Sequence, residues 1–555
     1  MLVIMDMGSM RTDGTCELKP FAILRFLQVR GIPFIYLIGF NDVAYPYSLT
    51  VTPTATIQET YSVNINLSSD KKQNAFVTEL NPGVSIIRQS ARSMLNLNYR
   101  MQNIYNSGGN SGLKTFNQLQ YNSHSIFIPD RLFLDSRSSI SQQNLNNNRL
   151  ANDNISGAGN STNVSTFGLS PYWTPHFSNF ANGNFRANFD TFTVGSGATA
   201  NQNSVSNSPA PISDSANLSE VVQLTSGNYF KRINWYLSFN NYDSIRSQGD
   251  DIKFQNSSGL IRTHINKYFN VFAQAGYSNN TFQSINNNQG NGAFYTVGGQ
   301  WTPSQHYSIE VGAGNNSHVT VKISPMQRLN WVTTYRDNSV GLNTSQTSQT
   351  SQTSQVGQVG QVGQVGTTWE TALTYQTRQS NWSITHNNLT TTSQQILLQD
   401  QNNLTNTQAT SPIITQQTPR SINNGFLSDE VIVQKIWNAS VSYMTGKSTV
   451  STNAYSRDSV YQISGSKQKA TGLNATWNWK FASQTSAYLR PQWQQTEYGD
   501  TNNKDQYYDI SVGLTRTITP QMNGRLEIRH SDQSSDIDTN NYQENRATAS
   551  LFMRF

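Results

Sequence analysis

The side chains that most often carry out chemistry are few and scattered in this chain. Its seven histidines occur singly, with no His-x-x-x-His pair and no HExxH motif, and its single cysteine, Cys16, lies ahead of the repetitive body. Gly446-Lys447-Ser448 resembles the end of a phosphate loop, but Val441 stands where that motif needs its first glycine. No Gly-x-Ser-x-Gly elbow occurs. The sequence therefore predicts no catalytic residue, no cofactor and no metal site.

The other candidates are charged residues that alternate with apolar ones along short segments. Successive side chains of a β-strand point to opposite faces, so in a membrane barrel these charges would face the interior. Positive charges outnumber negative ones in this set, and rings of Arg and Lys favour anions, although such charges can equally pair across neighbouring strands and carry no solute. The predicted pore-lining residues are Arg100, Arg232, Arg336, Lys480, Arg490, Arg525, Arg529, Glu310 and Glu527; the same parity turns Asp135, Asp509, Arg546 and Arg554 inward.

The elements that would position these residues are strands. From Leu49 onward, apolar residues recur at every second position for about ten residues, stop at a turn cluster and resume, which is the strand period. Leu473, Ala475, Trp477, Trp479 and Phe481, for example, interleave with polar residues. A soluble sandwich would show the same alternation, so the period alone does not identify a membrane protein.

Composition narrows the class of protein. Only 35% of the 555 residues are apolar and 13% charged, against roughly 45–50% and about 25% in an ordinary soluble domain. Asn, Gln, Ser and Thr fill the difference, while aromatic residues stay at 11%, which argues against disorder. A β-rich adhesin, a polar low-complexity chain and a wet-lumened barrel remain. The net charge of +6 is too diffuse to indicate nucleic acid as a partner.

Loop lengths favour the barrel. If strands pair as successive hairpins, the turns Gln89–Arg92, Pro129–Arg131, Thr302–Gln305, Pro325–Gln327, Arg378–Asn381 and Thr445–Lys447 are short. The long connections Asn144–Asn163, Gly195–Ala216, Ser339–Gly366 and Ser393–Ser428 all fall on the other parity. Short turns at one rim and long loops at the other are typical of outer-membrane barrels. We therefore predict an all-β fold, a single antiparallel transmembrane barrel of about 22–24 strands with long extracellular loops and short periplasmic turns.

The outer face of this barrel should be apolar, with aromatic rims. We expect a lipid-facing band and Trp residues toward its two edges, where a ring with one apolar and one wet side is favoured. The band would include Leu237, Leu473, Ala475, Leu489, Leu514 and Leu551, and the rims Trp235, Trp301, Trp331, Trp369, Trp382, Trp437, Trp479 and Trp493.

The two ends of the chain suggest export and membrane insertion. Residues 1–48 are interpreted as a signal or N-terminal extension, because the apolar run Ile32–Phe40 is too short to span a membrane and follows Lys19, Arg25 and Arg30. The C-terminal strand places Leu551, Met553 and Phe555 on one face, which resembles the signal by which outer-membrane proteins are recognised for insertion. Residues 49–555 would form the barrel.

Low-complexity segments belong in loops. Residues 344–366 repeat Thr-Ser-Gln and then Val-Gly-Gln, a tract with little means of building a core. No segment before residue 49 is long enough for the globular plug of a 22-stranded transporter, so Asn144–Asn163 and Gly195–Ala216 are the best candidates for constricting the lumen.

One family resemblance adds to this interpretation. Ile57-Gln-Glu-Thr-Tyr-Ser-Val-Asn-Ile65 followed by Asn81-Pro-Gly-Val-Ser85, and later Leu169-Ser-Pro-Tyr-Trp-Thr-Pro175, Ser226–Trp235, Ala275-Gly-Tyr277 and Gly299-Gln-Trp-Thr-Pro-Ser304, resemble in their order the landmarks of the PEP-CTERM system-associated outer-membrane family. These porin-like barrels belong to exopolysaccharide loci. Gln305-His306 departs from the Arg usual in that family, and its Gly-rich block is reduced to Gly312-Ala-Gly314. The resemblance implies a barrel encoded with exopolysaccharide synthesis, without catalytic residues.

Together these observations predict an outer-membrane porin-like channel or export conduit of a Gram-negative bacterium, associated with exopolysaccharide secretion, and not an enzyme. Its expected partners are outer-membrane lipid, the barrel insertion machinery, polysaccharide and periplasmic export components. Two alternatives stay open: a surface adhesin or scaffold anchored by the barrel, and an outer-membrane hydrolase assembled from distant strands.

Overall fold

The computed structural model describes residues 47–108, 112–145, 149–156, 160–195, 212–284, 290–340, 366–398 and 427–555. The predicted signal segment lies outside these ranges except for Tyr47 and Ser48, and the 344–366 repeat lies outside them except for Gly366. Both interpretations therefore stay predictions.

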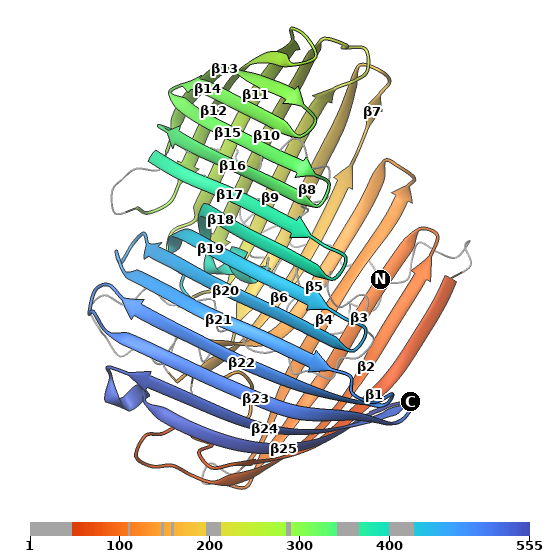
Figure 1. The fold of residues 1–555 in the computed structure, drawn as a ribbon, viewed down its shortest axis with the longest axis vertical. Helices are drawn as coiled ribbons and strands as arrows, with labels where there is room; N and C mark the ends of the chain where they lie inside the picture. The colour runs from red at the N-terminus through yellow and green to blue at the C-terminus, as the bar shows by residue number, and fades with distance from the viewer. Residues whose placement is uncertain are drawn as a thin grey trace, which may run out of the picture.

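The described chain forms one sheet that closes on itself. Each strand pairs antiparallel with the next along the chain, and the first pairs with the last, from Thr54 opposite Arg554 to Ser62 opposite Arg546. The two-residue strand β7 is only an appendage on β8, because β6 pairs directly with β8. The result is a 24-stranded barrel, which confirms the predicted fold class. In Figure 1 the wall runs from orange β1 through yellow and green to blue β25.

The strands have the following bounds. They are β1 (Tyr47–Ser62), β2 (Ala75–Ser90), β3 (Ser93–Asn106), β4 (Gly112–Ile128), β5 (Leu132–Asn144), β6 (Ser161–Trp173), β7 (His176–Phe177), β8 (Ala181–Val194), β9 (Ser215–Ser226), β10 (Ile233–Arg246), β11 (Ile252–His264), β12 (Phe269–Thr281) and β13 (Gly292–Ser304). They continue as β14 (Tyr307–Gly314), β15 (Asn316–Met326), β16 (Leu329–Asn338), β17 (Gly366–Gln376), β18 (Ser380–Thr392), β19 (Val431–Met444), β20 (Ser448–Tyr461), β21 (Lys467–Trp479), β22 (Thr485–Tyr498), β23 (Lys504–Thr519), β24 (Met522–Ser535) and β25 (Tyr542–Arg554).

Helical structure is minor. A 3-10 turn, η4 (Asp538–Asn540), lies between β24 and β25, and residues 393–398 form a short helix. Within the described ranges, no helix has the length and apolar character needed to cross a membrane.

The two rims of the barrel differ in the length of their connections. One rim carries tight turns such as 91–92, 129–131, 305–306, 377–379 and 520–521, and the chain enters β1 and leaves β25 there. The longest connections, 145–160, 195–214, 339–365 and 393–430, all join strand ends at the other rim. This is the asymmetry predicted from the loop lengths, and it orients the short-turn rim toward the periplasm.

The outer face is apolar because it meets lipid. Leu237, Leu473 and Leu514 keep 48%, 44% and 47% of their surface exposed. Exposed side chains of this size are costly in water, so a continuous apolar band of them marks a surface covered by acyl chains. The barrel is embedded in the outer membrane of a Gram-negative bacterium.

Tryptophans gather mainly near the periplasmic rim. Those close to the short-turn ends of their strands are Trp173, Trp235, Trp301, Trp331, Trp382, Trp477 and Trp479. Trp369 lies near the long-loop end of β17, whereas Trp437 lies in the middle of β19 and Trp493 in the second half of β22, away from both rims. The expectation of two aromatic rims therefore describes the periplasmic edge better than the extracellular one. Trp437 instead packs on its outer-face neighbours His386 and Trp369, with ring centroids 4.3 and 5.2 Å away.

The inner face accounts for the unusual composition. Small hydroxyl and amide side chains line the lumen and bond across neighbouring strands, as in Ser139 to Thr166 (2.9 Å), Ser238 to Ser258 (3.1 Å) and Thr320 to Thr334 (3.1 Å). A polar interior needs no apolar core between sheets, so Asn, Gln, Ser and Thr replace the missing Leu and Val.

The lipid-facing assignment predicts a strong depth dependence for a single substitution. Ile528 lies halfway along β24 with 71% of its surface exposed, whereas Ile537 is exposed in the extracellular connection before β25. Ile528→Arg should lower the free energy of unfolding by about 2–4 kcal/mol, and the matched Ile537→Arg by at most about 1 kcal/mol. Guanidinium titration in phospholipid vesicles, followed by tryptophan fluorescence, measures both. Equal effects at the two positions would contradict the membrane placement.

Candidate functional site in the lumen

The connection between β5 and β6 turns into the barrel. Its described part, residues 149–156, leaves the wall at β5 and contacts inner-face residues of β23, β24 and β25. Asn154 donates to Gln102 on β3 (2.8 Å) and to Gln142 on β5 (3.0 Å). The described part of this loop, which is one of the two predicted to constrict the lumen, therefore folds inward. We call residues 149–156 the inner loop.

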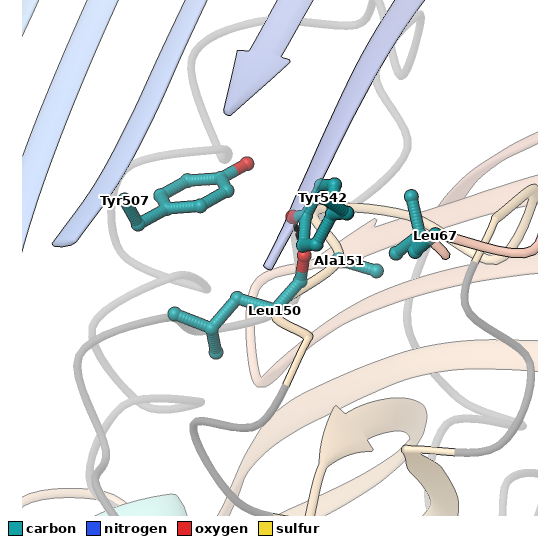
Figure 2. Close-up of a cluster of buried hydrophobic side chains, with 5 residues drawn as sticks. All are labelled: Leu67, Leu150, Ala151, Tyr507 and Tyr542. Carbon is teal, nitrogen blue, oxygen red and sulfur yellow. Dashed lines mark hydrogen bonds between the residues drawn. The ribbon is translucent and has the colours of Figure 1, made fainter. Parts of the chain in front are cut away.

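Apolar contacts hold the first part of the inner loop. Leu150 and Ala151 are buried against Tyr507 of β23, Tyr542 of β25 and Leu67 of the β1–β2 connection (Figure 2). The Leu150 backbone N–H donates to Gln533 Oε1 (2.8 Å), and its carbonyl oxygen accepts a hydrogen bond from the Tyr542 hydroxyl. The loop backbone thus keeps its hydrogen bonds in a place that water does not reach.

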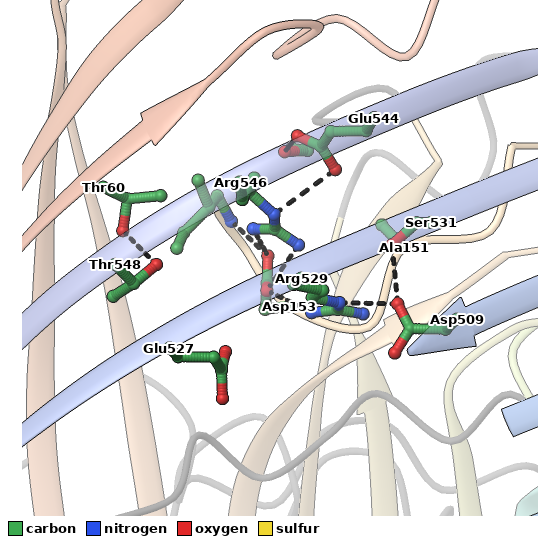
Figure 3. A network of polar contacts seen from close by, with 12 residues as sticks. Thr60, Ala151, Asp153, Asp509, Glu527, Arg529, Ser531, Glu544, Arg546 and Thr548 are labelled. Atoms are coloured by element: carbon green, nitrogen blue, oxygen red, sulfur yellow. Dashed lines mark hydrogen bonds and ion pairs between the residues drawn. The ribbon is translucent and has the colours of Figure 1, made fainter. Parts of the chain in front are cut away.

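Asp153 forms the ionic anchor of the inner loop. Its carboxylate lies between Arg529 of β24 (Oδ2 to Nη1, 3.0 Å) and Arg546 of β25 (Oδ2 to Nη2, 2.9 Å), as Figure 3 shows. Arg529 also contacts Asp509 and Arg546 also contacts Glu544. The two arginines are therefore shared between fixed carboxylates of the wall and one carboxylate of the loop.

The electrostatic environment keeps Asp153 ionised. Burial alone would raise the pKa of its carboxyl, but the charges of Arg546 and Arg529 and the hydrogen bond from the Ile155 backbone N–H outweigh burial. The pKa therefore lies well below its ordinary value of 3.8. The anchor stays charged throughout the neutral and mildly acidic range.

A second group of connections packs inside the barrel at the extracellular end of β6, β8 and β10. Ile212, Leu397 and Leu427 are buried against Val164 and Phe192. Asp429 accepts hydrogen bonds at Oδ1 from the Ser213 backbone N–H (2.9 Å) and from Gln394 Nε2 (2.6 Å). Burial raises the pKa of this carboxyl, and these hydrogen bonds offset only part of the shift. The described end of the predicted constriction Gly195–Ala216 thus lies in this cluster, while residues 196–211 lie outside the described ranges.

Below the inner loop, a cavity of about 300 Å³ opens in the lumen against β1, β2, β3 and β21 to β25. Five arginines line it, against two carboxylates: Arg100, Arg490, Arg525, Arg529 and Arg546, with Asp153 and Glu527. The lining thus carries more guanidinium groups than carboxylates, and Asp509 and Glu544 behind it pair with Arg529 and Arg546, which leaves a small excess of positive charge; hydroxyl and amide groups lie between the charges. We call it the arginine cavity.

The centre of its wall is a cluster around Tyr488 of β22. The Tyr488 hydroxyl donates to Glu527 Oε2 (2.5 Å) and accepts from Arg525 Nε (2.5 Å), and Arg525 also pairs with Glu527. The guanidinium carbons of Arg490 and Arg525 lie 4.3 and 5.0 Å from the centre of the Tyr488 ring, which is the distance of a cation–π contact.

The structure gathers five of the nine predicted pore-lining residues in this cavity: Arg100, Arg490, Arg525, Arg529 and Glu527. Elsewhere on the wall, Arg336 is buried and pairs with Glu370 (3.5 Å), and Glu310 pairs with Arg262 (2.8 Å) and His318 (3.2 Å). Arg232 and Lys480 lie in exposed periplasmic connections, because β10 begins at Ile233 and β21 ends at Trp479. The alternation of apolar and polar residues in the sequence continues past the ends of those two strands, so it wrongly placed both residues in the lumen. Leu551, Met553 and Phe555 share the outer face of the chain's end, and their role in insertion stays a prediction.

Sequence reasoning did not single out Asp153 or Tyr488. The signal for Asp153 was present, since it is the only acidic residue between Asp135 and Asp190, in a loop that also carries Leu150 and Ile155. A single carboxylate beside apolar residues in an Asn-rich loop suggests that the loop docks on the wall, because the lumen it faces is rich in arginine. For Tyr488 there was no such signal, because its partners are on β24.

Two histidines of the wall pair with acids, His124 with Asp135 (2.7 Å) and His318 with Glu310 (3.2 Å). In both pairs the carboxylate is shared with an arginine, and neither imidazole hydrogen-bonds to a serine within the described ranges. The same ranges hold no group of three potential metal ligands. The described wall thus offers no Ser–His–acid arrangement of the kind the hydrolase alternative needs.

No family model and no curated protein matches this chain. Among solved structures, it is similar to the siderophore receptor PirA from Acinetobacter baumannii (9% identity, 92% of this chain and 81% of that chain, TM-score 0.39) and to the FrpB iron transporter from Neisseria meningitidis (F5-1 variant; 9%, 91% and 82%, 0.41). A ferric enterobactin receptor mutant (PfeA) from Pseudomonas aeruginosa gives 7%, 91% and 80%, with a TM-score of 0.42. These similarities are too distant to transfer an activity.

The two buried aspartates should respond oppositely to the same substitution. Asp153→Asn removes the charge shared by two buried arginines, so it should lower the free energy of unfolding by about 3 kcal/mol and expose the inner loop. Asp429→Asn keeps an acceptor oxygen for Ser213 and Gln394 but removes an unfavourable buried charge, so stability at pH 7 should be unchanged or slightly higher. Guanidinium unfolding and hydrogen exchange of residues 149–156 measure this. A destabilised Asp429→Asn beside an unaffected Asp153→Asn would refute both assignments.

The same two groups predict a pH profile. The lowered pKa of Asp153 contributes stability that is present above its unfolded value near 3.8 and is lost as pH falls through the folded value. The free energy of unfolding of wild type should therefore exceed that of Asp153→Asn by the same margin at pH 8 and pH 5.

Asp429 predicts the opposite dependence. Because its pKa is raised, its ionisation lowers the free energy of unfolding as pH rises, so any advantage of Asp429→Asn at pH 7 should vanish in acid. Unfolding titrations of the three proteins at pH 8, 7, 5 and 4 test this; convergence of wild type and Asp153→Asn at pH 5 would contradict it.

Proposed function

We propose that this chain is an outer-membrane conduit for polar, anionic solutes, and that an acidic exopolysaccharide is the polymer it exports. The observation that carries the proposal is the arginine cavity beneath the inner loop, where five lining guanidinium groups outnumber the two lining carboxylates and the two further carboxylates, Asp509 and Glu544, that pair with them from behind. A water-filled passage with an excess of fixed positive charge raises the local concentration of anions and disfavours cations.

The size of the barrel supports a conduit that is narrowed by its own loops. Barrels of 16–18 strands already leave an aqueous channel, and 22-stranded ones hold a plug. This 24-stranded wall encloses more space than its wall side chains fill, and both the inner loop and the cluster around Asp429 lie within it. The inner loop contacts the wall through interactions in which at least one partner is a side chain, and it contributes no strand to the wall, so the sheet does not depend on the loop.

Exopolysaccharide is proposed as cargo on two grounds. The motifs from Ile57 to Ser304 resemble those of barrels encoded in exopolysaccharide loci, and a cationic lumen lined by hydroxyl and amide groups suits an acidic, heavily hydroxylated chain. Periplasmic export components would then meet the short-turn rim. The porin-like character of the channel is part of the same proposal.

Planar-bilayer recording tests the conduit. The wild-type channel should prefer anions, and replacing Leu150–Ile155 by a six-residue Gly-Ser segment should raise its conductance several-fold, because the inner loop then loses its anchors. The matched control replaces six residues of the 344–366 repeat by the same segment and should leave conductance unchanged.

Two outcomes would overturn the proposal. One is selectivity for cations. The other is the absence of conductance even after the inner loop is replaced, which would instead favour a surface scaffold anchored by the barrel. In that case, deleting Thr344–Gly366 should abolish attachment of cells to surfaces.

A further inference from the structure

We propose that Arg490 is a binding subsite for an oxyanion carried by the solute, in the first place the carboxylate of an acidic sugar. The inference rests on the proposed function, because it assigns the position in the arginine cavity at which an anionic chain binds. It concerns one residue that differs from the other arginines of the same cavity in its partners.

The other lining arginines already have partners. Arg525 pairs with Glu527, Arg529 with Asp509 and Asp153, and Arg546 with Asp153 and Glu544. Arg100 donates from Nε to the neutral Gln118 Oε1 (2.9 Å). Four of the five guanidinium groups are thus committed to holding the wall or the inner loop.

Arg490 has no such partner. Within the described ranges, it forms no hydrogen bond and no ion pair, and its contact is the face of the Tyr488 ring. Its side-chain nitrogens are not among the buried polar atoms that lack a partner, so they remain accessible from the cavity. A guanidinium with five N–H donors in a water-filled cavity, without a protein acceptor, is available to a ligand.

Its position is nevertheless fixed. The Tyr488 ring beneath Arg490 cannot swing away, because its hydroxyl is held by Glu527 and Arg525 on β24. An aromatic face in contact with the guanidinium orients the fork of donors, and less conformational freedom is lost when a ligand binds. Arg490 is therefore a preorganised cation and not a loose surface charge.

An oxyanion is the ligand that this environment favours. The guanidinium fork of Arg490 matches the two oxygens of a carboxylate, whereas Arg525, which lies against the same ring, is already paired with Glu527 and serves to hold that ring in place. Serine and threonine hydroxyls line the cavity nearby, at Ser486, Thr515 and Thr517, and they can bond the hydroxyls of a sugar ring. Inorganic phosphate offers similar oxygens but no ring, so the two sources can be separated by experiment.

Isothermal titration calorimetry of the detergent-solubilised full chain with trigalacturonate tests the subsite. Wild type should bind, Arg490→Gln should weaken binding at least ten-fold, and Arg490→Lys should fall between them because it keeps the charge but loses the fork. Arg378→Gln, in the exposed periplasmic turn 377–379, is the matched control and should bind as wild type. Neutral maltotriose should not bind, and inorganic phosphate at equal charge should bind more weakly than the oligomer.

The failures of this inference and of the conduit are distinguishable. Since Arg490 makes no ion pair, its substitution should leave the heat-modifiable electrophoretic mobility of the folded barrel intact. Equal affinity of wild type and Arg490→Gln, or binding of phosphate as tight as that of trigalacturonate, would overturn the sugar-acid subsite even if the channel conducts. Arg490-dependent binding in a barrel that shows no conductance would leave the subsite standing and remove the conduit.

Discussion

Every strand of this protein lies between hydrocarbon and water, and the rest of the structure follows from that constraint. Lipid offers no hydrogen-bond partners, so the sheet must close, which it does where β1 meets β25. Each strand must also present apolar side chains outward and can present polar ones inward, which gives the two-residue period and the high content of Asn, Gln, Ser and Thr. The charges of the inner face are then the part of the wall that is free to vary with function.

Those inner charges have two roles that the structure separates. Most are neutralised by a neighbour on the same wall, such as Glu310 by Arg262 or Asp190 by Arg137. Around the arginine cavity the balance of charge is different, because Arg529 and Arg546 also pair with a carboxylate that belongs to a loop and not to the wall. Asp153 arrives from a loop between β5 and β6, so the electrostatics of this part of the lumen depend on where that loop lies.

Much of the wall could be predicted from sequence, because each strand obeys a local rule. Leu473 and Trp477 mark the outer face of β21 by their spacing alone. The parity of short and long connections gave the orientation, and the chain length divided by the length of one strand and its turn gave about 22–24 strands. The ends of strands were less certain: Arg232 and Lys480 keep the alternation but lie in turns. Contacts across the lumen could not be predicted. The two-residue period fixes the face of the sheet to which Arg529 points, but it does not identify its partner, Asp153, which is distant in sequence. Nor does parity show that Arg490, unlike Arg525, lacks a carboxylate partner.

The anchors of the inner loop lie on the last strands to be made. Asp153 needs Arg529 and Arg546, and Leu150 needs Gln533 and Tyr542, all of which belong to β24 and β25. During assembly Asn154 can already bond Gln102 of β3 and Gln142 of β5, but Leu150 and Asp153 find their partners only when the C-terminal hairpin is in place. The final position of the inner loop is thereby coupled to completion of the barrel: in an unfinished wall the loop lacks its ionic anchor, and closing the wall with the last two strands supplies it.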